Sequence, residues 1–364
     1  MSSRRLRVVL WLPRTSIISG GHQVQVHETT RALRESGVDA RVETELRIDT
    51  DDVDLVHGFD LSAEEIHRCR SEGLPVVIST IYWDQRYGPD GLWQTNSLRS
   101  ALGTVRLAGR YVVTAIGDRK RMPETGLALA SAAASRLAAY EAADLLLPNS
   151  RGEAGDIERE LGVTTPMTVV PNGVRPDLFD QKGLPFERRT TVLCVARLEP
   201  HKNQLGLIKA LEGTSTRLVI LGPEHRDHPE YARRCRAAGA GWVEFVDAVP
   251  QEELRAHYAE ARVHVLPSWY ETTGLVSLEA ALSGCSVVST DRGHAGEYLG
   301  TLADYCDPSD SASIRRAIDT AWGKPPDPDL RARILDRYTW EHTAEITLTA
   351  YQSVLTPRAR RTIR

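Results

Sequence analysis

Residues 263–290 restrict the fold of this chain more than any other stretch. Residues 263–266 form a short apolar, β-branched run, which is typical of a buried strand. After a polar break, apolar residues spaced three or four apart over 275–282 predict a helix, and Gly284 stands where that helix would end. Residues 286–290 predict a second strand. Such a β-loop-α-β unit belongs to a parallel sheet, and its loop opens at the carboxyl edge of that sheet.

The same alternation of short apolar runs and helical patterns extends along both halves of the chain, which indicates an α/β fold with two doubly wound, Rossmann-like domains. We expect strands at residues 7–12, 40–46, 55–58, 76–81, 145–147, 167–170, 191–195, 217–221, 243–246, 263–266 and 286–290. We expect helices at residues 23–36, 63–72, 127–142, 151–161, 203–211, 229–238, 252–260, 275–282, 311–322 and 340–355. With 364 residues, the chain is long enough for two domains of ordinary size. A stretch rich in turn residues, from Pro171 to Pro185, indicates the hinge between them.

Composition argues against several classes of protein. The net charge of −4 disfavours a nucleic-acid-binding surface, so we expect no nucleic-acid partner. No apolar run approaches the roughly 18 residues that span a bilayer, and the apolar run at residues 8–12 fits a first strand better than a signal peptide. The five cysteines are scattered and form no CxxC pair, so disulfides and structural zinc are not expected. We expect each cysteine to be buried and the protein to be cytoplasmic.

Two carboxylates lie in the loop and helix of the 263–290 unit. Glu271 precedes the helix and Glu279 follows eight residues later, a little over two helical turns, so the two can face the same side. Thr273, Gly274 and Leu275 place backbone N–H groups at the helix start, where the dipole favours an anion such as a phosphate. Gly274 would leave room for it. The alternative is that the glutamates only cap and solvate an ordinary helix.

Two cations follow the first strand of the second half. Arg197 and Lys202 stand five residues apart in VARLEPHKN, just after the strand expected at 191–195. They would point across the same sheet edge as Glu271 and could neutralise a diphosphate without a metal. Taken alone, such a pair is most often surface charge. Its position after a strand favours a functional interpretation.

The run around the two glutamates resembles a known family signature. Its residues are Pro267, Ser268, Glu271, Gly274, Leu278, Glu279, Ala280 and Gly284. Together they resemble the signature of the retaining glycosyltransferases of family 4, whose architecture is called GT-B. The resemblance is strong from about residue 171 to 355 and only architectural before it.

The resemblance implies two Rossmann-like domains that face a cleft, with a C-terminal helix that crosses back to the first domain. It places an acceptor-binding domain at 1–178, a nucleotide-sugar-binding domain at 179–340 and the crossover helix with a basic tail at 341–364. The implied reaction is the transfer, with retention, of a sugar from a nucleotide diphosphate donor to a hydroxyl acceptor, either a glycan, a lipid-linked molecule or a small molecule.

The resemblance also assigns roles to residues. It implies that Glu271 lies near the sugar, Glu279 on the ribose, Arg197 and Lys202 on the donor phosphates, and the loop that ends at Val249 on the base. No cofactor is implied, and we expect no essential metal. Asp49, Asp51, Asp52 and Asp54 precede a strand instead of following it, so they would lie at the wrong sheet edge for a metal site.

Three features of the first half are candidate contacts. Gly20 and Gly21 lie together between the first strand and the first helix, where the backbone can approach a ligand closely; in the resembling family this loop contacts donor phosphate or acceptor. A plain turn is the alternative. His57 and the run from Tyr82 to Asp84 end two strands and should reach the cleft edge. The family often carries a histidine where this chain has Tyr82-Trp83-Asp84, which leaves the role of that histidine either to Asp84 or to no single side chain. Asp84 either orients the acceptor hydroxyl or caps a helix.

The segment from Arg99 to Arg121 interleaves arginines and a lysine with apolar residues. It is interpreted either as an amphipathic basic element that contacts anionic lipid or a phosphorylated acceptor, or as a solvated helix face. A peripheral membrane contact therefore stays open beside the nucleotide-sugar donor and the hydroxyl acceptor.

Two other functions are compatible with these residues. One is a nucleotide-sugar epimerase or a phosphorylase of the same fold. The other is a non-catalytic GT-B partner that only binds. The presence of Arg197, Lys202, Glu271 and Glu279 together argues against the non-catalytic alternative.

Overall fold

A computed structural model describes residues 4–13, 21–45, 52–82, 124–180 and 183–356. Their contacts divide them into two units. The first unit contains the described residues up to Pro171 together with those from Trp340 onwards, and the second contains Asn172–Thr339. Each unit is an α/β structure around one parallel sheet, as the sequence predicts.

The first unit has a five-stranded parallel sheet in the order β2-β1-β3-β4-β5. Its strands are β1 (Arg7–Trp11), β2 (Asp39–Glu43), β3 (Leu55–Phe59), β4 (Val76–Ser79) and β5 (Leu145–Leu147). Its helices are α1 (Gly21–Glu35), α2 (Ala63–Ser71), α5 (Glu124–Ala142), α6 (Arg151–Leu161) and α15 (Trp340–Leu355). Most of these elements begin and end within a few residues of the expected bounds.

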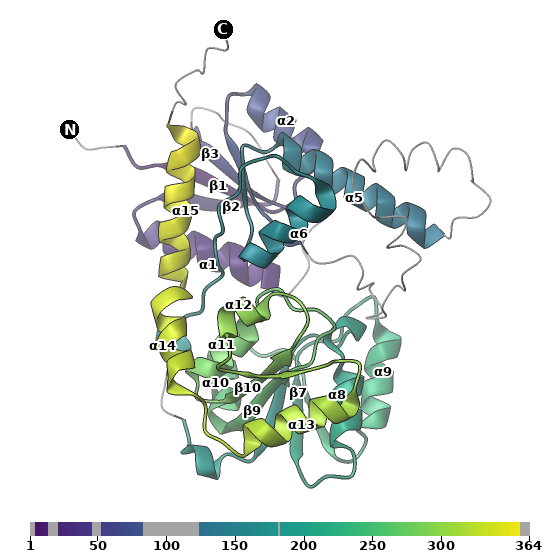
Figure 1. Cartoon of the computed structure of the whole chain (residues 1–364). Coiled ribbons are helices and arrows are strands. Elements are labelled where there is room, and N and C mark those ends of the chain that lie inside the picture. Colours follow the sequence, from purple (N-terminus) through teal and green to yellow (C-terminus); the bar gives the residue numbers. More distant parts are fainter. Residues whose placement is uncertain (1–3, 14–20, 46–51, 83–123, 181–182, 357–364) are drawn as a thin grey trace. The chain divides into compact units, whose positions relative to one another are not determined.

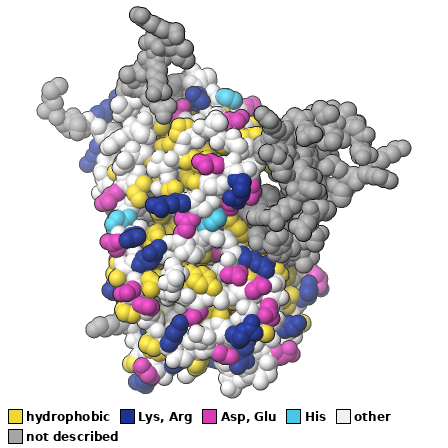
Figure 2. All heavy atoms as spheres, in the orientation of Figure 1, with side chains coloured by type: hydrophobic (Ala, Val, Ile, Leu, Met, Phe, Trp, Pro, Cys, Tyr) yellow, Lys and Arg dark blue, Asp and Glu magenta, His cyan; other side chains and the backbone are white. Residues whose placement is uncertain are grey.

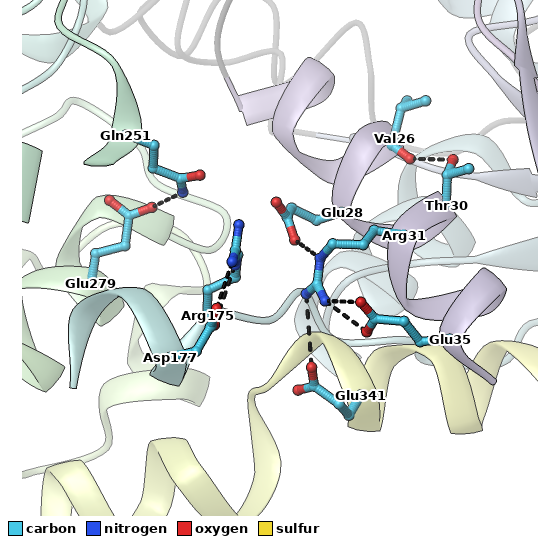
Figure 3. Close-up of polar contacts among 10 residues, drawn as sticks. All are labelled: Val26, Glu28, Thr30, Arg31, Glu35, Arg175, Asp177, Gln251, Glu279 and Glu341. Atoms are coloured by element: carbon cyan, nitrogen blue, oxygen red, sulfur yellow. Dashed lines mark hydrogen bonds and ion pairs between the residues drawn. The ribbon is translucent and has the colours of Figure 1, made fainter. Parts of the chain in front are cut away.

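Helices cover both faces of this sheet. Apolar side chains of α2, α5 and α6 pack with those of β1, β3, β4 and β5 into one core. Helices α1 and α15 lie side by side (Figure 1). Arg31 of α1 forms ion pairs with Glu28 and Glu35, and lies 3.7 Å from Glu341 of α15 (Figure 3). The last helix therefore belongs to the first unit, as expected for a helix that crosses back.

The second unit has a six-stranded parallel sheet in the order β11-β10-β9-β6-β7-β8. Its strands are β6 (Thr191–Val195), β7 (Arg217–Leu221), β8 (Val243–Val246), β9 (Ala261–Leu266), β10 (Ser286–Thr290) and β11 (Asp304–Cys306). Its α-helices are α7 (Pro176–Phe179), α8 (Gln204–Leu211), α9 (Pro229–Ala238), α10 (Gln251–Glu260), α11 (Leu275–Leu282), α12 (Ala295–Leu299), α13 (Ser311–Trp322) and α14 (Pro328–Arg337).

Alternate residues of the central strands build two cores, one on each face of this sheet. In β6, Val192 and Cys194 pack against α8, α9 and α13, whereas Leu193 and Val195 pack with α7, α10, α11 and α14. Because both faces are covered, β6 is apolar at every position from Val192 to Val195 instead of alternating with polar residues. The five cysteines are unpaired and buried, as expected.

Three expectations differ from the structure. Residues 167–170 form no strand: only Met167 bridges to Leu146, and Pro148 beside them has no N–H to continue a ladder. Residues 328–337, where no helix was expected, form α14, which begins at Pro328. Division of the chain falls after Pro171 instead of after residue 178, because the amide N–H groups of Asn172 and Val174 already donate to atoms of the second unit.

Charged side chains of both signs are interspersed over the face in view (Figure 2). Asp52 and Asp54 form ion pairs with Arg7 of β1, which gives them a structural role beside that strand.

Candidate functional site

The site is built at the carboxyl edge of the second sheet, where β6, β9 and β10 end. Glu271 lies in the loop after β9, and its backbone is fixed to the loop after β10. Its N–H donates to the carbonyl oxygen of Arg292 at 3.1 Å, and its own carbonyl oxygen accepts from the N–H of His294 at 2.7 Å. Gly293 permits this approach: its φ is +95°, and a Cβ there would lie 2.3 Å from the Glu271 carbonyl oxygen.

Helix α11 begins directly after this loop, with Gly274 as its N-cap residue. Gly274 has a left-handed φ of +70°, and the nearest atom to an added Cβ would be Glu271 Cγ at 3.4 Å. Backbone conformation, more than lack of space, therefore favours glycine here. The first amide groups of the helix have no partner within it, so they are suited to bind an anion.

Lys202 and Glu271 form a direct ion pair at this edge. Lys202 Nζ lies 2.8 Å from Glu271 Oε2, which also accepts a 3.1 Å hydrogen bond from the Ser268 hydroxyl. Burial by itself would raise the pKa of Glu271, but the charge and hydrogen bond of Lys202, with His201 and Ser268, bring that pKa below its usual value. Glu271 is therefore an ionised carboxylate at neutral pH. The sequence placed both residues at this edge but did not predict their pairing.

Arg197 lies in the loop after β6, together with Lys202. Its Nη2 donates to Glu199 Oε1 at 3.1 Å, and its backbone carbonyl accepts from Gln204 Nε2 at 2.7 Å. Between the two cations lies His201, which is buried; burial first, and then the charge of Lys202, lower its pKa to about 4. A neutral His201 thus leaves Arg197 and Lys202 as the cations of this loop.

Glu279 has partners on a different helix. It lies on α11, and its carboxylate accepts from Tyr258 Oη at 3.0 Å and from Gln251 Nε2 at 3.3 Å. Both partners lie on α10, and Figure 3 shows the contact with Gln251. Only 6% of Glu279 is exposed. Its side chain is therefore held in a fixed direction instead of solvating the helix, which was the alternative from sequence.

Asn172 lies in the turn-rich stretch that was predicted only as a hinge. Its N–H donates to Tyr298 Oη at 3.1 Å, and its Nδ2 lies 3.3 Å from the hydroxyl oxygen of Thr273, at the start of α11. The Pro-Asn-Gly run gave a turn signal, but nothing in it indicated contact with a helix start a hundred residues away. Glu199, Gln251 and Tyr258 were missed for the same reason.

Val249 lies in the loop between β8 and α10. It is partly buried and packs, like Val246, against the core that contains α10 and α11. The loop thus ends beside the helix that holds Glu279, and its role toward a nucleotide base stays a prediction.

The candidate residues of the first half are placed differently from expectation. His57 does not end β3 but is its third residue and is buried, with Nδ1 2.7 Å from Tyr351 Oη of α15 and Nε2 2.8 Å from Ser79 Oγ. Burial lowers the pKa of His57 to about 3. Tyr82 is also buried, and its N–H donates to Glu153 at 2.7 Å. Both residues therefore hold the first unit together.

Gly21 is the first residue of α1, and an added Cβ would meet no described atom within 4 Å. Gly20, Asp84 and the segment from Arg99 to Arg121 lie outside the described residues.

Two findings bear on a metal and on a membrane, and both concern the described ranges alone. Within them, no group of three or more histidine, cysteine, aspartate or glutamate side chains is arranged to hold a metal ion. Among the described helices, none is both long and apolar enough to cross a membrane. The expectation that catalysis needs no metal stays a prediction.

Comparison with known proteins connects the second unit to a family. Residues 189–323 match the family model described as "Glycosyl transferases group 1". Over 254 residues, the chain is 31% identical to a D-inositol 3-phosphate glycosyltransferase of Acidothermus cellulolyticus, a match that covers 60% of this chain and 55% of that protein. The chain spans about half the length of the curated relatives it matches.

Solved structures resemble nearly the whole chain. A sucrose-phosphate synthase from Thermosynechococcus elongatus matches with a TM-score of 0.71 at 18% identity, over 96% of this chain and 99% of that chain. Anabaena HepE, solved in complex with UDP-glucose, matches with a TM-score of 0.68 at 15% identity, over 96% and 100%. The chain has the GT-B fold, as expected, and residues 189–323 of its second unit match a glycosyltransferase family model.

Proposed function

We propose that this chain is a retaining glycosyltransferase of family 4, which transfers a sugar from a nucleotide diphosphate sugar to a hydroxyl acceptor. The proposal rests on one observation: Lys202, from the loop after β6 that also carries Arg197, forms a part-buried ion pair with Glu271, from the loop that leads into α11. Cations, an ionised carboxylate and a helix N-terminus meet at the carboxyl edge of a parallel sheet, where ligands bind in such folds.

The cations are suited to a diphosphate. Arg197 presents a planar set of donors and Lys202 a compact charge, and the amides at the start of α11 add a partial positive charge. Together they can balance the charge of a diphosphate without a divalent metal. The resemblance to a structure described as a complex with UDP-glucose supports a donor of this class.

Glu271 would act on the sugar. Because its pKa lies below the usual value, it is charged when the donor binds and accepts hydrogen bonds from sugar hydroxyl groups. As the bond between the sugar and the diphosphate breaks, positive charge grows on the sugar and negative charge on the phosphate. Glu271 stabilises the positive charge on the sugar, and Arg197, Lys202 and the helix start stabilise the negative charge on the phosphate. Such electrostatic stabilisation lowers the barrier by several kcal/mol.

The proposed transfer needs no covalent enzyme intermediate. The acceptor oxygen bonds to the anomeric carbon from the face that the diphosphate leaves, and the acceptor proton passes to the departing diphosphate. We propose that the first unit binds the acceptor, with Asp84 orienting its hydroxyl and the Gly20-Gly21 loop in contact with substrate. Glu279 would hold the donor ribose, and the loop at Val249 the base.

Product analysis tests this proposal. The full chain is incubated with a panel of nucleotide sugars and hydroxyl acceptors from three classes, namely glycans, lipid-linked sugars and small polyols. The expected result is free nucleoside diphosphate together with a glycoside whose anomeric configuration, measured by NMR, equals that of the donor. An isomerised nucleotide sugar without diphosphate release would indicate an epimerase. In a parallel incubation of a glycan with inorganic phosphate, formation of a sugar phosphate would indicate a phosphorylase. An inverted glycoside would contradict retention.

A further inference from the structure

The guanidinium of Arg197 has a hydrogen-bond partner at one terminal nitrogen and none at the other among the described residues. Its Nη2 donates to Glu199 Oε1 at 3.1 Å. Its Nη1 is buried and has no hydrogen-bond partner among the residues that the structure describes. A buried charged donor without a partner is costly, so this nitrogen is suited to an anionic oxygen that arrives with a ligand.

Glu199 is itself buried, with 7% of its surface exposed, and it has a second neighbour on the loop after β7. His225 Nε2 lies 3.7 Å from Glu199 Oε2. The backbone N–H of Asp227 donates to His225 Nδ1 at 3.2 Å, so in the neutral ring Nδ1 accepts and Nε2 carries the proton that faces Glu199. The glutamate is thus oriented between His225 and Arg197.

The backbones of the two loops are also joined. Leu198 N–H donates to the carbonyl oxygen of Pro223 at 2.9 Å, and His225 N–H donates to that of Leu198 at 3.3 Å. At Gly222, where φ is +146°, a Cβ would lie 2.2 Å from the carbonyl oxygen of Ala196. The loop that carries His225 is therefore fixed against the loop that carries Arg197 and Glu199.

We propose that Glu199 is a positioning residue, which, with His225 behind it, directs Arg197 Nη1 toward the phosphate of the donor. This inference rests on the proposed function, because it needs a diphosphate at Arg197. A negative charge beside an anion site would by itself weaken anion binding. Glu199 offsets this cost by holding the guanidinium in its bound direction before the ligand arrives.

The sign of the effect separates positioning from plain charge. If Glu199 acts only as a charge, Glu199→Ala and Glu199→Gln both tighten diphosphate binding. If it positions Arg197, Glu199→Ala weakens binding by about tenfold, the scale of one hydrogen bond to a charged group. Glu199→Gln, which keeps an acceptor oxygen for Arg197, loses less.

Calorimetry on the full chain at fixed salt measures the diphosphate affinity of each variant. UDP, GDP and ADP are titrated first, and the tightest of them is then compared with its monophosphate for each variant. The positioning role predicts that Glu199→Ala lowers affinity for the diphosphate more than for the monophosphate, and that it has no further effect in an Arg197→Gln background. Glu224→Gln is the matched control, since Glu224 lies in the same loop as His225 but is exposed and pairs with Arg236 of α9. Glu199→Gln replaces Glu199→Ala if the alanine variant does not fold.

Each outcome identifies what fails. If the wild-type chain binds none of the three diphosphates, the proposed function falls and this inference falls with it. If the wild type binds one of them but the Glu199 variants bind it equally or more tightly, only the positioning role is wrong. Additive losses in the double variant would also overturn it.

Discussion

Replacing Gly293 with alanine should displace Glu271 by a backbone collision. An alanine Cβ at this position would lie 2.3 Å from the Glu271 carbonyl oxygen and 2.8 Å from its nitrogen. That oxygen accepts from His294 N–H at 2.7 Å and from Ala295 N–H at 3.2 Å, so it cannot move without weakening both hydrogen bonds. The collision is with main chain, and no side-chain rotation relieves it.

The destabilisation by Gly293→Ala has two parts, conformational strain and overpacking, and a control glycine separates them. Gly213 also has a left-handed φ, +73°, but an added Cβ there would meet no described atom within 4 Å. Gly213→Ala should therefore cost only the conformational strain, about 1–2 kcal/mol. Gly293→Ala should add an overpacking cost of about 1–3 kcal/mol, for a total of about 2–5 kcal/mol in the free energy of unfolding.

Urea unfolding measures both variants against the wild type. Since a chain with two domains can unfold in more than one step, the transition to follow is the one that a bound nucleoside diphosphate shifts to higher urea. Gly293→Ala should lower this midpoint more than Gly213→Ala does, and it alone should reduce donor turnover. Equal midpoints together with equal turnover would refute the role given to the contact between residues 271 and 293.

Three further predictions concern buried polar contacts. Lys202→Met leaves Glu271 buried without its cation and should cost about 3–5 kcal/mol in unfolding free energy at pH 7. Because the folded-state pKa of Glu271 is below its ordinary 4.5, the pair stabilises the fold fully above that pH and less as the pH falls. In urea unfolding, Lys202→Met should therefore lower the unfolding free energy less at pH 4 than at pH 7. Equal losses at the two pH values would contradict the pairing. Burial lowers the pKa of His57 to about 3 from 6.5, so the folded first unit binds fewer protons than the unfolded chain between these values. The unfolding free energy of that unit should therefore fall as the pH drops from 6.5 toward 3. If unfolding curves of His57→Gln and wild type gave the same slope of unfolding free energy against pH, His57 would be excluded as the cause. Tyr258→Phe removes one donor to Glu279 and should weaken nucleoside diphosphate binding by about threefold to tenfold in calorimetry, whereas unchanged affinity would argue against Glu279 as a ligand contact.

Local sequence pattern was sufficient to predict much of the architecture. Apolar runs such as Val192–Val195 are buried on both faces of a parallel sheet, and short runs of this kind identified every strand that the structure describes except β11. The position of Arg197 and Lys202 after one strand and of Glu271 after another was enough to place them at one sheet edge. That inference depends only on the direction of parallel strands.

Contacts between distant elements could not be predicted. Nothing near Glu279 in the sequence indicates Tyr258, and nothing near Glu199 indicates His225, because these pairs depend on how α10 packs on α11 and how two loops meet. For His57, an exposed position was predicted, and that prediction was wrong. A polar residue near the end of a short strand was expected at an open edge, but α15 returns from the far end of the chain and encloses it through Tyr351.

The most direct test of the proposed donor site is a crystal structure of the full chain with the nucleoside diphosphate that binds it most tightly. We expect phosphate oxygens within hydrogen-bond distance of Arg197 Nη1, of Lys202 Nζ and of the amides at the start of α11. A diphosphate bound elsewhere, with the Arg197 and Lys202 side chains turned away from it, would contradict the proposed donor site.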